Sequence, residues 1–152
     1  MNSVFQGGKS GQHGQYSEST RVADVMTKGV ITLNPNNSFA KAVELMATGN
    51  FRHLVIADEE QKVLGVISDR DIFRCQSRIA EWQVKQVGEV MTSQPITVTP
   101  ETLLSVAVST MVSKKINCLP VVEDTGTVCG IVTSTDIMKS YHSMLESMEH
   151  TR

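Results

Sequence analysis

Apolar and polar positions along the chain follow one pattern that is written twice. Short β-branched runs at 30–33 and 96–98 end before a proline and predict strands. Each is followed by apolar residues at i, i+3, i+4 and i+7, which predict a helix, with Asn37 or Ser38 and Thr102 as the expected N-caps. Two apolar runs joined by a polar turn come next and predict a hairpin, and a second helix follows. The predicted order is β-α-β-β-α, twice.

An internal duplication explains this repetition. Residues 22–74 align with 87–139 without a gap, so that VADVMT meets VGEVMT and LGVISDRDI meets CGIVTSTDI. A match of this length indicates two copies of one unit. One copy of about 53 residues is marginal for burying enough apolar surface alone. We therefore expect an α+β fold in which the two copies pack about a pseudo-twofold axis.

Composition divides the chain into four segments. Residues 1–20 are rich in Gly, Ser and Gln and are expected to form a disordered tail. The first repeat is placed at 21–80, the second at 81–142, and a C-terminal tail at 143–152. Apolar residues at helical spacing run into that tail, and we expect them to close the fold or to contact a second chain: Tyr141, Met144, Leu145 and Met148.

Charge and cysteine content exclude several classes of protein. The formal net charge of −2 provides no basic surface for nucleic acid or for an anionic membrane. The sequence contains neither a run of about 20 apolar residues, as a membrane-spanning helix requires, nor a signal-peptide pattern. Cys75, Cys118 and Cys129 form no C-x-x-C pair, so we expect no metal site and a reducing, cytoplasmic location.

The most informative repeated feature is a hydroxyl residue followed three positions later by an aspartate. Ser68 and Asp71 form the first pair, and Thr133 and Asp136 form the second. One interpretation is a capping box at the start of each second helix. The other is a ligand site, because free N–H groups at a helix start bind phosphate and a carboxylate accepts hydrogen bonds from a ribose. The residues alone leave both interpretations open.

The repeated pattern VMT…IT…P…A…M, followed by G-(I/V)-(I/V)-(S/T)-x-x-D, resembles a tandem pair of cystathionine-β-synthase (CBS) domains, also called a Bateman module. The resemblance covers about residues 22–142 and implies a stand-alone, regulatory, non-catalytic CBS-domain protein. It implies an adenine nucleotide as regulatory ligand, AMP before ADP, ATP or S-adenosylmethionine, and no catalytic cofactor. It also implies a homodimer and an unidentified regulated protein.

The resemblance further implies which residues bind the ligand. Asp71 and Asp136 match the ribose-binding carboxylate of the family, and each cleft takes its second wall from the opposite copy. The residues implied for the first of two clefts are Thr133, Thr135, Asp136, Val30, Ile31, Phe51, Arg52 and His53. Those implied for the other are Ser68, Arg70, Asp71, Pro95, Ile96, Ile116, Asn117 and Cys118. If only one cleft is filled, the cleft of Asp136 is expected, because Arg52 and His53 suit phosphate.

Three alternatives to nucleotide sensing follow from the same residues. A purely structural dimerisation module would use the aspartates only as helix caps. A second alternative binds S-adenosylmethionine or a dinucleotide. Nucleotide hydrolysis ranks last, because the sequence contains no P-loop and no repeated histidine that would act as a base. Four methionines at equivalent positions are expected to pack along the seam between the copies: Met26, Met46, Met91 and Met111.

Overall fold

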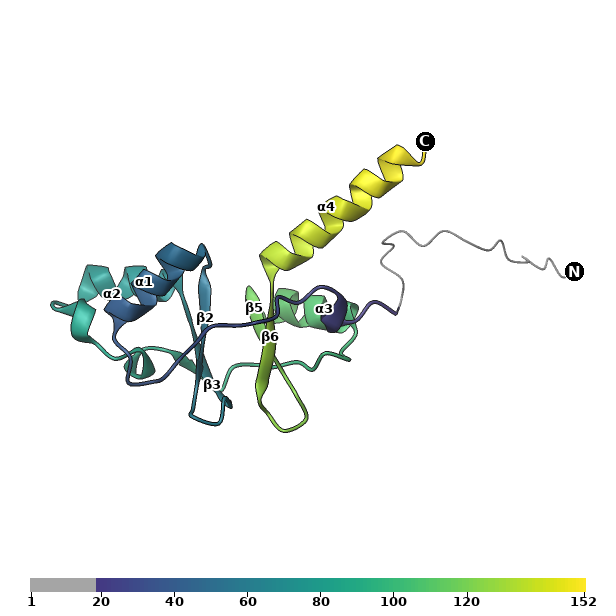
Figure 1. The fold of residues 1–152 in the computed structure, drawn as a ribbon. Coiled ribbons are helices and arrows are strands. Elements are labelled where there is room, and N and C mark those ends of the chain that lie inside the picture. The colour runs from purple at the N-terminus through teal and green to yellow at the C-terminus, as the bar shows by residue number, and fades with distance from the viewer. Residues whose placement is uncertain (1–18) are drawn as a thin grey trace, which may run out of the picture.

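The computed structural model describes residues 19–152 and consists of two lobes side by side, with the last helix projecting from the second lobe (Figure 1). Most of the tail predicted over 1–20 lies outside the described residues. The elements of the first lobe are β1 (Thr32–Leu33), α1 (Phe39–Gly49), β2 (His53–Ala57), β3 (Val63–Ser68) and α2 (Asp69–Arg78). Those of the second lobe are α3 (Leu104–Lys114), β5 (Cys118–Val122), β6 (Val128–Thr133) and α4 (Ser134–His150).

Short elements lie before and between these two sets. Strand β4 (Thr92–Ser93) precedes the second lobe. Single 3₁₀ turns occur at Val22–Asp24, Trp82–Val84 and Val87–Glu89. The order of the elements confirms the α+β class and the two repeats. The first strand predicted for the second repeat, at 96–98, is reduced to a single bridge at Val98.

The two sheets are built alike. The first has the order β1-β2-β3-β4, with β1 parallel to β2 and the other pairs antiparallel. The second consists of β5 and β6 and is extended by two isolated bridges. Val98 bridges Val121 in parallel, and Thr27 bridges Ile131 in antiparallel orientation. These bridges stand at the positions that β1 and β4 occupy in the first sheet.

The first helix of each lobe begins differently. Ser38 caps α1, because its hydroxyl accepts a hydrogen bond from the backbone N–H of Lys41 at 3.3 Å. The expected cap at Thr102 is wrong: α3 starts after Leu103 without a side-chain cap. The Thr102 hydroxyl instead accepts from the backbone N–H of Thr99 at 3.0 Å, within the preceding turn.

The first segment of each repeat docks on the lobe formed by the rest of the other repeat. At the start of the first repeat, the backbone N–H of Val22 donates to Thr102 O at 2.9 Å. At the start of the second repeat, the backbone N–H of Val87 donates to Asn37 O at 2.8 Å. Val22 is fully buried in the core of the second lobe, and Val87 is fully buried in the core of the first. Each lobe is therefore completed by residues from the opposite repeat.

Two of the four methionines, Met26 and Met91, lie against a strand of the opposite lobe and not in the seam between the hairpins. A Cβ atom on Gly65 would lie 2.4 Å from Met91 Sδ, and one on Gly130 would lie 2.8 Å from Met26 Sδ. Glycine is thus required in β3 and β6 where the crossing methionine covers the strand. The other two methionines of the set, Met46 and Met111, pack into the cores of their own lobes. The expectation that all four line the seam is wrong.

The seam itself is formed by the two hairpins. Val55, Cys118 and Ile131 are buried there, and four partly buried valines pack around them: Val30, Val63, Val66 and Val128. At the hairpin tips the backbone N–H of Val128 donates to Gln61 O at 2.9 Å. The seam thus combines apolar packing with backbone pairing between the repeats.

Replacing Val87 with Ala tests the exchange of segments. We expect Val87→Ala to lower the free energy of unfolding by about 1.5–3 kcal/mol, because it removes buried methyl groups and leaves a cavity. Urea denaturation measures this loss. Val84→Ala is the control, because this side chain is 74% exposed in the same linker. Equal effects of the two substitutions would contradict the docking of Val87.

Candidate functional site

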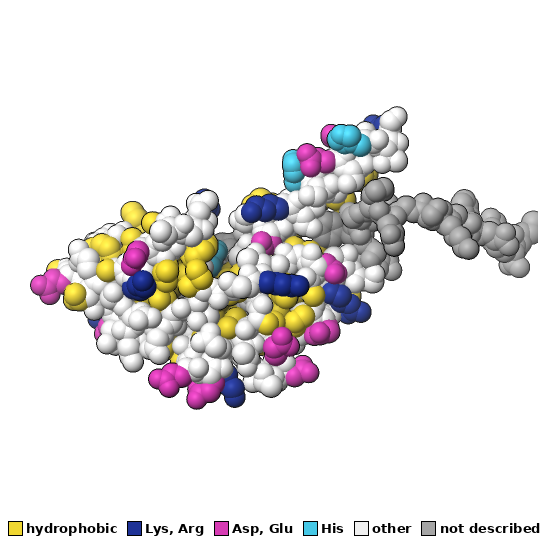
Figure 2. Space-filling view, in the orientation of Figure 1, with side chains coloured by type: hydrophobic (Ala, Val, Ile, Leu, Met, Phe, Trp, Pro, Cys, Tyr) yellow, Lys and Arg dark blue, Asp and Glu magenta, His cyan; other side chains and the backbone are white. Residues whose placement is uncertain are grey.

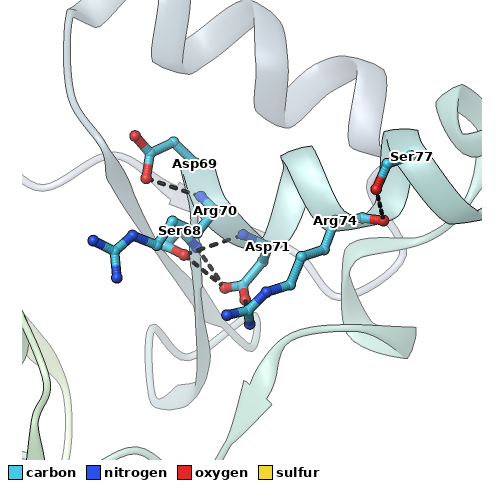
Figure 3. Close-up of polar contacts among 6 residues, drawn as sticks. All are labelled: Ser68, Asp69, Arg70, Asp71, Arg74 and Ser77. Carbon is cyan, nitrogen blue, oxygen red and sulfur yellow. Dashed lines mark hydrogen bonds and ion pairs between the residues drawn. The ribbon is translucent and has the colours of Figure 1, made fainter.

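The site is built from two equivalent corners, each at the junction of a strand and a helix. The first corner is the turn from β3 into α2 with Ser68 and Asp71, and the second is the turn from β6 into α4 with Thr133 and Asp136. In the first corner Asp71 Oδ2 accepts from the backbone N–H of Ser68 at 2.8 Å and from its hydroxyl at 3.0 Å (Figure 3). The Ser68 hydroxyl in turn accepts from the backbone N–H of Asp71 at 3.3 Å.

The second corner repeats these bonds. Asp136 Oδ2 accepts from the backbone N–H of Thr133 at 2.8 Å and from its hydroxyl at 2.9 Å. The Thr133 hydroxyl accepts from the backbone N–H of Asp136 at 3.2 Å. Both corners are therefore capping boxes, as one interpretation of the sequence predicts. Each cap occupies Oδ2 of its aspartate and leaves Oδ1 to other partners.

Oδ1 has a different partner in each corner. Asp136 Oδ1 accepts from the hydroxyl of Thr27 at 3.0 Å. Asp71 Oδ1 lies 3.9 Å from Nη1 of Arg74, which is exposed one turn further along α2. Neither Thr27 nor Arg74 was predicted from the sequence as a site residue. The signals present were the repeated VMT motif, which contains Thr27, and the i, i+3 spacing of Asp71 and Arg74.

The residues just before β2 and β5 border the corners through the backbone. The N–H of Asp69 donates to Arg52 O at 2.9 Å, and the N–H of Ser134 donates to Asn117 O at 3.0 Å. Arg52 and Asn117 thus lie beside the corner of their own repeat, with both side chains exposed.

Electrostatic effects place two further side chains at the first corner. Burial lowers the pKa of His53, against the opposing effect of Asp69 and Asp71. Burial, together with the charge of Asp71, raises the pKa of the Cys118 thiol to about 11. Cys118 belongs to the second repeat, and the charge of Asp71 in the first repeat acts on it. His53 was assigned to the cleft of Asp136, but the carboxylates that act on it are Asp69 and Asp71.

The other residues assigned to the two clefts differ in what they pack against and in how far they reach solvent. Phe51 and Ile116 pack against the cores of their own lobes, and the Phe51 ring covers Gly49 at the end of α1. Val30 packs in the seam. Side chains that reach solvent, fully or in part, are those of Ile31, Ile96, Pro95, Arg70 and Thr135.

The first turns of α2 border an open concavity of about 520 Å³ beside the first corner. Its lining contains the guanidinium groups of Arg70 and Arg74 and the exposed ring of Phe73, together with Asp69 and Gln76. In Figure 3, Arg74 lies beside the Asp71 carboxylate, whereas the Arg70 side chain extends in another direction. The concavity thus presents two cations at the start of α2, and one of them, Arg74, lies beside Asp71.

Residues 19–152 contain neither a metal site nor a membrane-spanning helix. Over this range, the structure contains no group of three or more His, Cys, Asp or Glu residues placed to hold a metal ion. No helix in the same range is long and apolar enough to cross a membrane.

Comparison with known sequences gives the same family for both repeats. The sequence model of the CBS domain matches residues 22–78 and again 87–143. Inosine-5′-monophosphate dehydrogenase from Methanocaldococcus jannaschii is 30% identical over 116 residues, which are 76% of this chain and 22% of the enzyme. The chain spans about a quarter of the length of the first curated relatives it matches.

Two solved structures with bound ligands resemble the whole described fold. A CBS domain pair in complex with 5′-methylthioadenosine and S-adenosyl-L-methionine has a TM-score of 0.75 and 33% identity, covering 80% of this chain and 99% of that chain. CBSX2 in complex with AMP has a TM-score of 0.73 and 28% identity, covering 82% and 97%. CBSX2 is a CBS-pair protein from Arabidopsis thaliana.

The lowered pKa of His53 predicts how stability depends on pH. Because the folded protein resists protonation of His53, the unfolded chain binds more protons as the pH falls through the ordinary value of 6.5. The free energy of unfolding should therefore fall between about pH 7.5 and 5.5, and His53→Gln should reduce this fall. Urea denaturation across that range measures it. The control is His142→Gln, on the exposed surface of α4, which should keep the wild-type slope. Parallel curves for wild type and His53→Gln would contradict the prediction.

Proposed function

This chain belongs to the CBS domain family and contains two of its repeats, and on that premise we propose that it is a regulatory protein that senses an adenine nucleotide. The ligand would bind at the two corners, with AMP the first choice, and the protein would not be an enzyme. Some of its relatives are enzymes, but the match covers only a small part of them, 22% of the dehydrogenase. Their catalytic activity is therefore no argument that this chain is an enzyme.

One observation carries the proposal: each corner is met by residues of the other repeat. Thr27 belongs to the first repeat and donates to Asp136 of the second. Cys118 belongs to the second repeat and lies within the field of Asp71 in the first. A ligand held by either aspartate would therefore contact both repeats. The residues that we propose for its binding are those named from the sequence, with Arg74 added.

The chemistry of the corners fits an adenosine compound. The cap at Oδ2 orients each carboxylate, and Oδ1 is the atom that would accept hydrogen bonds from ribose hydroxyls. The start of α2 or α4 supplies a positive dipole end for a phosphate. The ligands of the two similar structures, AMP and S-adenosyl-L-methionine with 5′-methylthioadenosine, share an adenosine group.

Regulation would follow from differential affinity. A ligand shifts an equilibrium only if it binds one arrangement of the repeats, or of two subunits, more tightly than another. A ligand that contacts both repeats meets this requirement. The state so favoured would be read by a partner protein, and we propose a cytoplasmic setting because all three cysteines are free thiols.

Thermal unfolding with and without nucleotide tests the proposed function. AMP, ADP, ATP and S-adenosylmethionine are each added at millimolar concentration. A ligand at 100 times its dissociation constant adds about 2.7 kcal/mol, which raises the melting temperature of a chain of this size by roughly 5–10 °C. If none of the four compounds shifts the transition, the module is a structural scaffold instead.

Asp136→Ala and Asp71→Ala are the matched variants for this experiment. Each should cost about 1 kcal/mol of stability without ligand, which is the effect of a lost cap. The pair should also abolish most of the ligand-induced shift, because charge-assisted hydrogen bonds to the ribose are lost. A double variant that keeps the full shift would show that the aspartates do not bind the sugar.

We also propose that two copies associate through α2 and α4. Phe73 on α2 and Met138 on α4 stand at equivalent positions of the two repeats, and they are 71% and 63% exposed. Tyr141, Leu145 and Met148 continue the exposed face of α4. Figure 2 shows that hydrophobic side chains also reach the visible surface of both lobes. Covering such a face is a common reason for a soluble protein to dimerise.

Introducing charge on this face tests the dimer. The double variant Phe73→Glu with Met138→Glu should sediment as a monomer at concentrations where the wild type is a dimer. Val112→Glu is the control, because Val112 is also exposed, at 73%, but lies on α3. A dimer that survives the double variant, or that Val112→Glu also dissociates, would place the interface elsewhere.

A further inference from the structure

The aspartates of the two corners differ in the number of acceptor positions that they have left. Asp136 accepts three hydrogen bonds: two at Oδ2 from Thr133 and one at Oδ1 from Thr27. Asp71 accepts two, both at Oδ2 and both from Ser68. An ionised carboxylate offers about four lone-pair positions, so about two remain at Asp71 and about one at Asp136.

The difference arises in the segments that cross between the repeats. Thr27 and Thr92 are equivalent residues of the repeated VMT motif, and each pairs with the strand that leads into a corner. The Thr27 hydroxyl reaches Asp136 at 3.0 Å. At the first corner, Oδ1 of Asp71 instead faces Arg74, at 3.9 Å. One threonine therefore closes its corner, and the equivalent threonine leaves the other corner open.

We propose that the first corner is the primary nucleotide site and that Thr27 holds the second corner closed. This inference rests on the nucleotide-binding function proposed above. The neighbouring hydroxyls of a ribose donate two hydrogen bonds, and Asp71 can accept both without rearrangement. Asp136 can accept both only after the Thr27 hydroxyl has left Oδ1. The corner of Asp71 would therefore fill before the corner of Asp136, which is the reverse of the order expected from Arg52 and His53.

The charges around the corners indicate which ligand the first corner selects. Arg70 and Arg74 line the concavity at the start of α2, whereas the equivalent residues of the second repeat are Thr135 and Lys139. A guanidinium group binds phosphate through two parallel hydrogen bonds, which a hydroxyl or an ammonium group cannot do. The ligand class for the first corner is therefore a phosphorylated nucleoside.

Because Thr27 closes the second corner, a ligand that binds there also changes the contacts of the segment that contains Thr27. Thr27 exchanges backbone hydrogen bonds with Ile131 in β6, at 2.8 and 3.0 Å. Displacing its hydroxyl removes the side-chain contact between this crossing segment and the start of α4. A ligand in the second corner would therefore loosen the segment at 20–27, whereas a ligand in the first corner would leave it in place.

Calorimetric titration with AMP, using one threonine variant and its counterpart, tests the proposal. Thr27→Val removes the competing hydroxyl but keeps a β-branched side chain and the backbone pairing. We expect it to tighten the weaker binding event about 3- to 10-fold, or to reveal a second event where the wild type has one, since a net hydrogen bond is worth about that factor. Thr92→Val, the matched control, should leave both events unchanged.

Two further variants assign the events to the corners. Asp71→Asn should abolish the tighter event and Asp136→Asn the weaker one, with circular dichroism confirming that each variant is folded. Loss of the tighter event in Asp136→Asn, or unchanged affinities in Thr27→Val, would overturn the proposal while nucleotide binding itself stands. If wild-type protein binds none of AMP, ATP and S-adenosylmethionine, the proposed function fails and this inference fails with it.

Discussion

Backbone hydrogen bonds that cross between the repeats hold the two lobes in one arrangement. The N–H groups of Val22 and Val87 each donate to a carbonyl of the opposite lobe, and both side chains are fully buried there. Because buried backbone groups must be paired, neither segment can be withdrawn without a large cost in free energy. The corners depend on this constraint, since the segment that contains Thr27 reaches Asp136 only because it is docked on the second lobe.

Capping and ligand binding do not exclude each other at these corners. In both, the cap uses one carboxylate oxygen, Oδ2, and leaves Oδ1 to other partners. A side chain oriented before a ligand arrives loses little further entropy on binding. The Ser-x-x-Asp and Thr-x-x-Asp motifs can therefore serve both roles. One oxygen of the carboxylate caps the helix, and the other would bind the ligand.

The spacing of apolar and polar residues along the sequence predicted the features that depend on residues close together in the chain. The order of elements, the capping boxes at Ser68 and Thr133 and the apolar spacing along α4 all depend on residues close in sequence. The exchange of segments was not predictable in this way, because the two VMT motifs have the same periodicity whichever lobe they join. The contact of Thr27 with Asp136 was missed for the same reason, since it joins residues far apart in the chain.

The exchanged segments also bear on how a duplicated chain of this kind arose. A single repeat leaves its own leading segment without a place to dock and leaves its core without a Val22 or a Val87. An ancestor of one repeat would have completed its fold by trading that segment with a second molecule. Joining two repeats in one chain replaces an encounter between molecules with a tethered one, at an effective concentration on the order of millimolar. Two repeats in one chain need not stay identical, and the two corners of this chain are unequal.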